Sequence, residues 1–146
     1  MVERVPLKRC WDYAGERDIR PYPVMEFIVK NPVIGREAPV RARVDTGFSG
    51  ELMLAFDYWR GLELGKTILA SPGEYGTFTG PLITWRAPVI LLFPELDLEL
   101  EAIAETPISF LGLPQRTLVG RGILNKLFLE LRGPEEKCCA LHGDAC

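Results

Sequence analysis

Residues 41–50 have the sequence RARVDTGFSG, which holds both a strand pattern and the point where that pattern stops. Polar and apolar residues alternate from residue 37 to residue 44, which is the period of a half-buried β-strand. Asp45 is the first residue after the alternation, and Gly47 and Gly50 then break it. The sequence therefore predicts a strand that presents Asp45 at its end.

The rest of the chain predicts many short strands with one or two brief helices. Gly- and Thr-rich residues at 71–80 separate two β-favouring segments, which is typical of a long hairpin with its tip near residues 78–80. Short helices are expected within 56–64 and 121–126. This pattern favours an all-β fold, either a closed barrel or a sandwich.

The length of 146 residues favours one domain with a sizeable core. Residues 1–21 show no sustained period, and Gly133-Pro134 ends the ordered pattern. We therefore expect an irregular N-terminal arm at 1–21, a folded domain at 22–132 and a C-terminal tail at 133–146.

Composition and charge exclude several classes of partner. The net charge is -3, and no stripe of Lys and Arg is interleaved with aromatic residues, so a nucleic-acid partner is not expected. No apolar run reaches the ~18 residues of a membrane-spanning helix, and residues 1–10 lack the apolar core of a signal peptide. We therefore expect no membrane partner, a cytoplasmic location and reduced cysteine thiols.

Two kinds of chemistry fit the sequence poorly. Ser49 lies in a glycine-flanked stretch, but its spacing differs from a nucleophile elbow, and the single histidine, His142, lies near the C-terminus. The C-terminal residues also include four potential zinc ligands, but two of them are adjacent, which is poor zinc geometry: Cys138, Cys139, His142 and Cys146. We therefore expect a solvated tail and no metal site.

Carboxylate chemistry fits better. Asp45, Thr46 and Gly47 supply in order an acid, a hydroxyl that can bond across a site, and a residue without a side chain to obstruct close approach. Activation of water by this route uses two carboxylates that share a proton, as in the aspartic proteases. The alternative is a turn in which Asp45 only caps a strand.

The chain resembles the retropepsin-like aspartic protease family, the retroviral-type proteases and their prokaryotic relatives. Asp45-Thr46-Gly47 at the end of an apolar strand matches the catalytic triplet of that family, and Ser49 fits its extension. The stretch TLVGRGILNKLFLEL at 117–131 resembles the later signature, in which an apolar pair precedes Gly120-Arg121, a short helix and a last strand. The resemblance covers residues 22–132.

The resemblance implies a small closed β-barrel that forms a homodimer, with one Asp45 from each subunit on the two-fold axis. It implies an aspartic endopeptidase that acts on a peptide or protein substrate without a cofactor. Thr46, Gly47 and Ser49 would support the site, and Arg121 would stabilise the fold. Residues along the substrate would include Phe48 and the tip of a flap: Phe78, Thr79 and Gly80. The alternative is a non-catalytic peptide-binding or assembly module that retains the fold.

Overall fold

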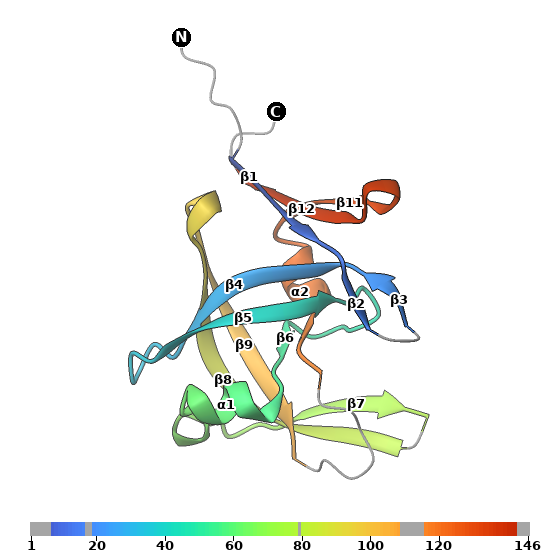
Figure 1. Cartoon of the computed structure of the whole chain (residues 1–146). Helices are drawn as coiled ribbons and strands as arrows, with labels where there is room; N and C mark the ends of the chain where they lie inside the picture. Colours follow the sequence, from blue (N-terminus) through green and yellow to red (C-terminus); the bar gives the residue numbers. More distant parts are fainter. Residues whose placement is uncertain (1–6, 17–18, 79, 109–115, 143–146) are drawn as a thin grey trace.

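The structure is a computed structural model that describes residues 7–16, 19–78, 80–108 and 116–142. Strands dominate it, with two short α-helices and three 3₁₀ turns (Figure 1). The strands are β1 (Leu7–Asp12), β2 (Ala14–Glu16), β3 (Ile19–Tyr22), β4 (Val24–Lys30), β5 (Glu37–Val44), β6 (Leu52–Met53), β7 (Gly73–Thr77), β8 (Gly80–Phe93), β9 (Leu98–Pro107), β10 (Leu118–Val119), β11 (Phe128–Arg132) and β12 (Lys137–His142). The helical elements are α1 (Phe56–Gly61), α2 (Arg121–Leu124), η1 (Leu64–Lys66), η2 (Pro94–Leu96) and η3 (Gly133–Glu135). The all-β prediction is confirmed.

Seven strands form the main sheet, in the order β4-β5-β10-β6-β9-β8-β7. An additional antiparallel pairing of β4 with β8 joins the sheet into a ring of six strands, from which β7 continues outward. Two short inner strands are added in parallel, β10 on β5 and β6 on β9. The pairing of β10 with β5 brings the two signature segments, which are far apart in the sequence, to the same place in the fold.

The ring encloses the apolar core because its strands alternate as the sequence predicts. In β5 the residues Val40, Ala42 and Val44 are buried, whereas the residues between them face outward or are half-buried. The largest side chains with almost no exposure come from the ring strands, the residue after β6, the segment of α1 and η1, η2 and α2: Met25, Leu52, Leu54, Leu62, Leu64, Leu91, Phe93, Leu96 and Ile123.

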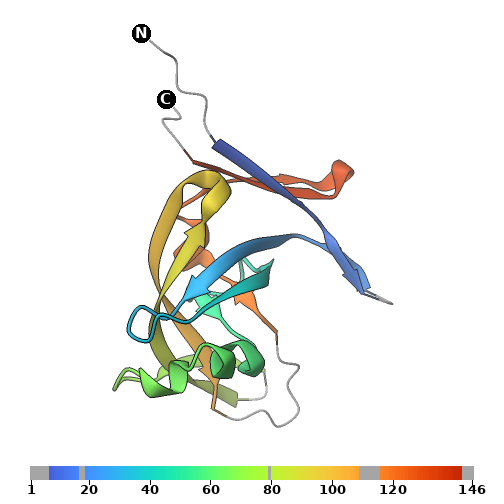
Figure 2. The ribbon, with the colours of Figure 1, turned by 60° about the vertical axis from the view of Figure 1, so that its left-hand side comes forward.

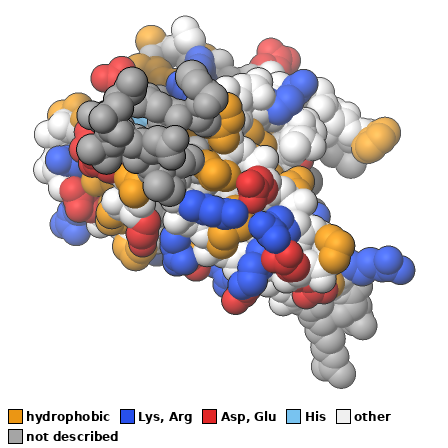
Figure 3. Space-filling model, turned by 90° about the horizontal axis from the view of Figure 1, so that it is seen from above, with side chains coloured by type: hydrophobic (Ala, Val, Ile, Leu, Met, Phe, Trp, Pro, Cys, Tyr) orange, Lys and Arg blue, Asp and Glu red, His pale blue; other side chains and the backbone are white. Residues whose placement is uncertain are grey.

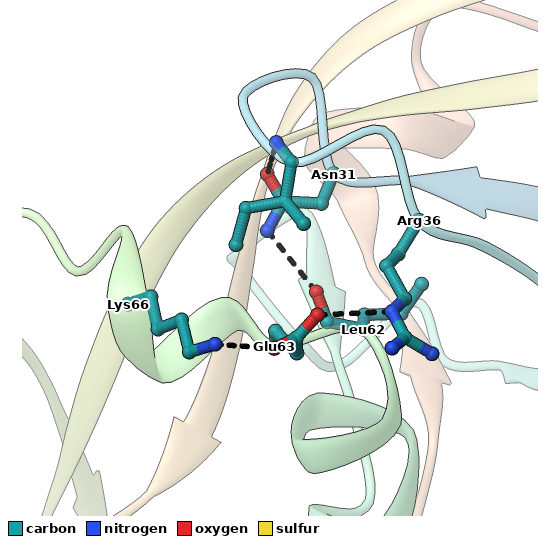
Figure 4. Close-up of polar contacts among 6 residues, drawn as sticks. Asn31, Arg36, Leu62, Glu63 and Lys66 are labelled. Carbon is teal, nitrogen blue, oxygen red and sulfur yellow. Dashed lines mark hydrogen bonds and ion pairs between the residues drawn. The ribbon is translucent and has the colours of Figure 1, made fainter.

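Hydrogen bonds and ion pairs connect the turn between β4 and β5 to the loop after α1 (Figure 4). The fully buried Asn31 donates its side-chain amide to the carbonyl oxygen of Leu62 at 3.1 Å. Glu63 has a left-handed backbone with φ of 54°, and its carboxylate binds both Arg36 and Lys66. The hydrogen bond from Lys66 is the main cause that lowers the pKa of Glu63. The turn and the helix are therefore joined by several polar contacts.

The N-terminal and C-terminal segments correct two predictions. Residues 7–12 were expected to be irregular, but they form β1, which pairs with β12 in the three-stranded sheet β1-β12-β11 above the ring (Figures 1 and 2). Residues 137–142 were expected to be a solvated tail, but Cys138, Cys139 and Ala140 are buried. Neither segment has a clear strand pattern of its own. Their order comes from pairing with distant segments, β1 with β12, and β12 with both β1 and β11.

Two cysteine thiols also differ from the prediction that they are reduced. Cys10 lies opposite Cys139 in the register of β1 and β12, and the two form a disulfide across 129 residues of sequence. Cys138 points to the other face of β12 and is a buried free thiol. The prediction failed because cysteine spacing alone does not reveal a contact between the two ends of a chain. The cytoplasmic location stays a prediction.

The face seen from above in Figure 3 carries basic and acidic side chains close together. Within the three-stranded sheet, Lys8 lies 3.1 Å from Glu130 and Lys137 lies 2.9 Å from Asp12. The hydrogen bond from Lys137 lowers the pKa of Asp12. These surface charges are therefore largely balanced by neighbours of opposite sign.

None of the helices in the described ranges is long and apolar enough to cross a membrane.

Candidate active site

Asp45 continues the strand geometry of β5 beyond its last ladder residue. The backbone N–H of Arg43 donates to Thr117 at 2.9 Å, and the backbone N–H of Asp45 donates to Val119 at 3.0 Å. The two donors are two positions apart on one strand and the two acceptors are two positions apart on the other, as in a regular parallel pairing. The carboxylate then accepts a hydrogen bond from the backbone N–H of Gly47 at 2.9 Å. Asp45 is therefore half-buried and held at a fixed point between β5 and β10.

The loop after Asp45 interlocks with the second signature through the backbone. Gly120 donates to the carbonyl of Glu51 at 2.9 Å, Arg121 donates to Phe48 at 2.9 Å, and Gly122 donates to Gly50 at 3.0 Å. These three bonds join the triplet loop to the start of α2. The structure thus brings together the two segments that the sequence analysis selected, and it does so by main-chain contacts.

Gly120 is required by this close approach. A Cβ atom built there lies 2.4 Å from the carbonyl oxygen of Gly50 and 2.7 Å from that of Phe48. Real Cβ atoms do not approach other atoms so closely, and the φ of -103° at Gly120 is open to any residue. Glycine is therefore needed at this position for space and not for backbone conformation.

Phe48 lies beneath the loop. Its side chain is 9% exposed, and its ring lies 5.4 Å from that of Tyr75, between centroids, at a tilt of 60°. It also lies within contact of the places where Gly50 and Gly120 lack side chains. In this chain the ring acts as packing for the loop, and its role toward a substrate stays a prediction.

Three of the other predicted support residues lie on the outside of the loop. Thr46, Gly47 and Ser49 are exposed, so this side of the loop is accessible to another molecule. Arg121 is also exposed, and no carboxylate among the described residues forms an ion pair with it. Its observed role is the backbone bond to Phe48.

The predicted flap is the hairpin of β7 and β8, which projects from the ring in Figure 1. Phe78 at its tip is fully exposed, and Gly80 has a φ of +119°, which favours glycine. Thr79, predicted to be part of the flap, lies outside the described residues. The long hairpin was predicted correctly, and Phe78 is free to contact another molecule.

A buried carboxylate that the sequence pattern did not reveal lies at the base of this hairpin. Glu105 is 2% exposed, and its two oxygens accept hydrogen bonds from the hydroxyls of Tyr75 and, at 2.8 Å, Thr84. Arg86 lies 3.8 Å away. Burial, followed by this carboxylate, raises the pKa of Tyr75. Glu99 and Glu101 on the same strand are exposed, and nothing in the local sequence distinguishes Glu105 from them.

Tyr75 links the two parts of the site. Its hydroxyl binds Glu105 under the hairpin, while its ring packs on Phe48 under the triplet loop. Gly73 makes room for the cluster, because a Cβ there would lie 2.2 Å from the carboxylate of Glu105. The hairpin base and the Asp45 loop are therefore coupled through one side chain.

The residues weighed for other chemistry are dispersed. Cys138 is buried, Cys139 is in the disulfide, and Nδ1 of His142 lies 2.9 Å from the carbonyl oxygen of Leu96. Cys146 lies outside the described residues. Within the ranges that the structure describes, no group of three or more His, Cys, Asp or Glu residues is placed to hold a metal ion.

Comparison with known proteins supports the fold. No family model matches the chain. No curated protein matches it in sequence. Among solved structures, a retroviral protease shares its arrangement, so the chain has a retropepsin-like fold. That structure is the EIAV protease complexed with the inhibitor HBY-793, at a TM-score of 0.51 and 17% sequence identity, covering 77% of this chain and 93% of the EIAV chain.

Proposed function

We propose that this protein is an aspartic endopeptidase whose active site forms in a homodimer. The observation that carries the proposal is the Asp45 carboxylate, held by the N–H of Gly47 on an exposed loop that is locked to Gly120 and Arg121. The retropepsin-like fold supports the same assignment. Each chain offers one such carboxylate, so two subunits are needed to supply the pair.

In the proposed reaction the two Asp45 carboxylates share one proton. The ionised carboxylate takes a proton from a water molecule while the oxygen of that water attacks the peptide carbonyl carbon. The protonated carboxyl group donates its proton to the carbonyl oxygen. The tetrahedral intermediate then breaks at the C–N bond, with a proton passing to the leaving nitrogen. The chemistry uses water alone, so no metal or organic cofactor takes part. A bell-shaped pH profile is expected, and its two limbs belong to the coupled pair.

The exposed surface around the carboxylate supports the dimer. Thr46, Gly47 and Ser49 are small and exposed at the place where a second loop would have to approach. The exposed Phe78 on the hairpin would cover a bound peptide and exclude water from the reacting groups. The substrate is a peptide in an extended conformation, lying between the hairpin and the two loops.

The test is Asp45→Asn, which is nearly isosteric and removes the acid. We expect it to abolish cleavage of a mixed peptide library while the circular dichroism spectrum and the dimer, measured by analytical ultracentrifugation, stay unchanged. Asp57→Asn is the matched control, because Asp57 is an exposed carboxylate on α1. Cleavage that persists in Asp45→Asn, or a strictly monomeric wild-type protein, would contradict the proposal.

The same experiment distinguishes the peptidase from the non-catalytic alternative. A peptide-binding or assembly module would retain peptide binding and show no cleavage in either the wild type or Asp45→Asn. A statine-type transition-state mimic adds a second criterion. It should block cleavage by the wild-type dimer if the two carboxylates act on a tetrahedral intermediate.

A further inference from the structure

A basic cavity lies beside the Asp45 strand. It has a volume of about 330 Å³, and no Asp or Glu is among the described residues that line it. Its polar lining comes from β5, from the segment before β10 and from two tyrosines: Arg41, Arg43, Arg116, Thr117, Tyr22 and Tyr58. Three arginines around one cavity are unexpected in a chain with a net charge of -3. The volume is within the range of small ligand sites.

The cavity lies on the same face as the candidate catalytic carboxylate. Arg41, Arg43 and Asp45 are alternate residues, and the strand pairing with Thr117 and Val119 continues regularly through Asp45. Alternate side chains of a strand point to one face and are about 7 Å apart. A peptide bound at Asp45 would therefore place a neighbouring side chain within reach of Arg43.

Arg43 is held in position by a cation–π contact with Tyr22. Its guanidinium carbon lies over the ring of Tyr22, 4.4 Å from the centroid, and a guanidinium group held in this way can still donate hydrogen bonds from its N–H groups. No ion pair involving Arg43 is found among the described residues. The hydroxyl oxygen of Thr117 accepts from the N–H of Ala55 at 3.1 Å, so its own proton can be donated into the cavity.

The other two arginines add charge. Arg116 is exposed and forms no ion pair within the described ranges. Arg41 lies 3.8 Å from Glu26, but both side chains are about half exposed, so this pair is weak. Three like charges around one cavity raise its affinity for an anion, and guanidinium groups bind carboxylates in a bidentate geometry.

We propose that this cavity binds the carboxylate side chain of a Glu or Asp residue of the peptide substrate, close to the bond that is cleaved. The inference rests on the proposed function and adds its substrate class. Arg43 and Arg116 are specificity-determining residues in this account. Arg41 contributes to the local potential.

The test measures binding and cleavage separately. Binding uses Asp45→Asn protein and fluorescent peptide pools that are randomised except at one position, fixed as Glu or as Gln. We expect the preferred Glu pool to bind about tenfold more tightly than the matched Gln pool, and the difference to shrink with added salt. Arg43→Gln and Arg116→Gln, each added to Asp45→Asn, should each remove about tenfold of the affinity for Glu peptides and leave the Gln peptides almost unchanged.

Matched variants keep the test decisive. Arg132→Gln, on the remote strand β11, should change nothing. Arg116→Gln is the safer of the two cavity variants for folding, because its side chain is exposed, whereas Arg43 also packs on Tyr22. Thermal unfolding of each variant checks that the fold is retained.

The outcomes distinguish this inference from the proposed function. Cleavage by the wild type without any preference for Glu over Gln overturns the inference and leaves the peptidase proposal in place. Binding of Glu pools that depends on Arg43 and Arg116, in a protein that never cleaves, supports the acidic-peptide site and contradicts the peptidase proposal. Equal binding of Glu and Gln pools, or no measurable binding of any Glu pool, also overturns the inference.

Discussion

Replacing Gly120 by alanine tests the contact on which the candidate site depends. The added Cβ would lie 2.4 Å from the carbonyl oxygen of Gly50 and 2.7 Å from that of Phe48. Ordinary contacts begin at 3.4 Å, so the nearer oxygen must move by about 1 Å. Both atoms belong to the backbone, which cannot swing aside as a flexible side chain can. The whole loop after Asp45 therefore has to shift.

The cost follows from what that shift disturbs. The two carbonyls accept hydrogen bonds from Arg121 at 2.9 Å and from Gly122 at 3.0 Å. Overpacking costs about 1–3 kcal/mol, and weakening two hydrogen bonds adds about 1 kcal/mol each at most. We expect Gly120→Ala to lower the free energy of unfolding by about 1–5 kcal/mol, which corresponds to a fall of about 0.5–2.5 M in the urea midpoint for an m-value of about 2 kcal/mol/M. A shift of about 1 Å at the carboxylate would also reduce any cleavage rate about 100-fold.

The assay is urea unfolding followed by tryptophan fluorescence, together with peptide cleavage. Gly133→Ala is the matched control, since a Cβ at Gly133 meets nothing within 4 Å, and its unfolding free energy should change by no more than about 0.5 kcal/mol. A Gly120→Ala protein with the stability and activity of the wild type would refute the argument, because the loop and α2 could not then be packed as described.

Three further outcomes are expected. Cys10→Ser, or reduction of the wild type, should lower the unfolding free energy by about 4–5 kcal/mol, because the disulfide with Cys139 closes a loop across 129 residues; equal stability with and without reductant would show that the bond is absent. Tyr75→Phe keeps the ring but removes the hydroxyl that donates to the buried Glu105, so calorimetry should show a loss of about 1.5–3 kcal/mol; an unchanged melting temperature would contradict the cluster. Burial raises the pKa of the Cys138 thiol from 9.0 to about 11, so the unfolded chain loses this proton first, and the free energy of unfolding should fall as the pH rises from about 9 to 11. Cys138→Ala should flatten that pH dependence. A Cys138→Ala protein whose stability follows the same pH profile as the wild type would contradict this argument.

Local pattern was enough to predict the elements that carry their own signal. The alternation through β5 (Glu37–Val44) buries Val40, Ala42 and Val44 as predicted, and the Gly/Thr-rich stretch forms the hairpin of β7 and β8. In both cases the periodicity and the turn residues lie within about twenty residues of each other, so the local sequence is sufficient to predict these elements. The order of the strands around the ring could not be predicted in this way, because it depends on pairings between distant segments.

The two ends of the chain show the opposite situation. Leu7–Asp12 and Lys137–His142 lack a strong pattern, yet each supplies the other with a hydrogen-bonding edge, and Cys10 meets Cys139 in their register. An expectation of an arm and a tail follows when each segment is considered alone. Their order depends on pairing with segments that are distant in the sequence, and β12 also pairs with β11.

The sequence by itself determined that Asp45 follows a buried strand, that Gly47 comes two residues later, and that Gly120-Arg121 opens a short helix. These are properties of neighbouring residues, and the physical chemistry of strands and turns fixes them. Tertiary structure alone decided that Phe48 packs beneath the loop against Tyr75, that Glu105 is buried, and that the arginines before Asp45 share a cavity with Arg116. Burial and charge at these positions depend on which distant segment covers each residue, and only the folded chain brings those segments together.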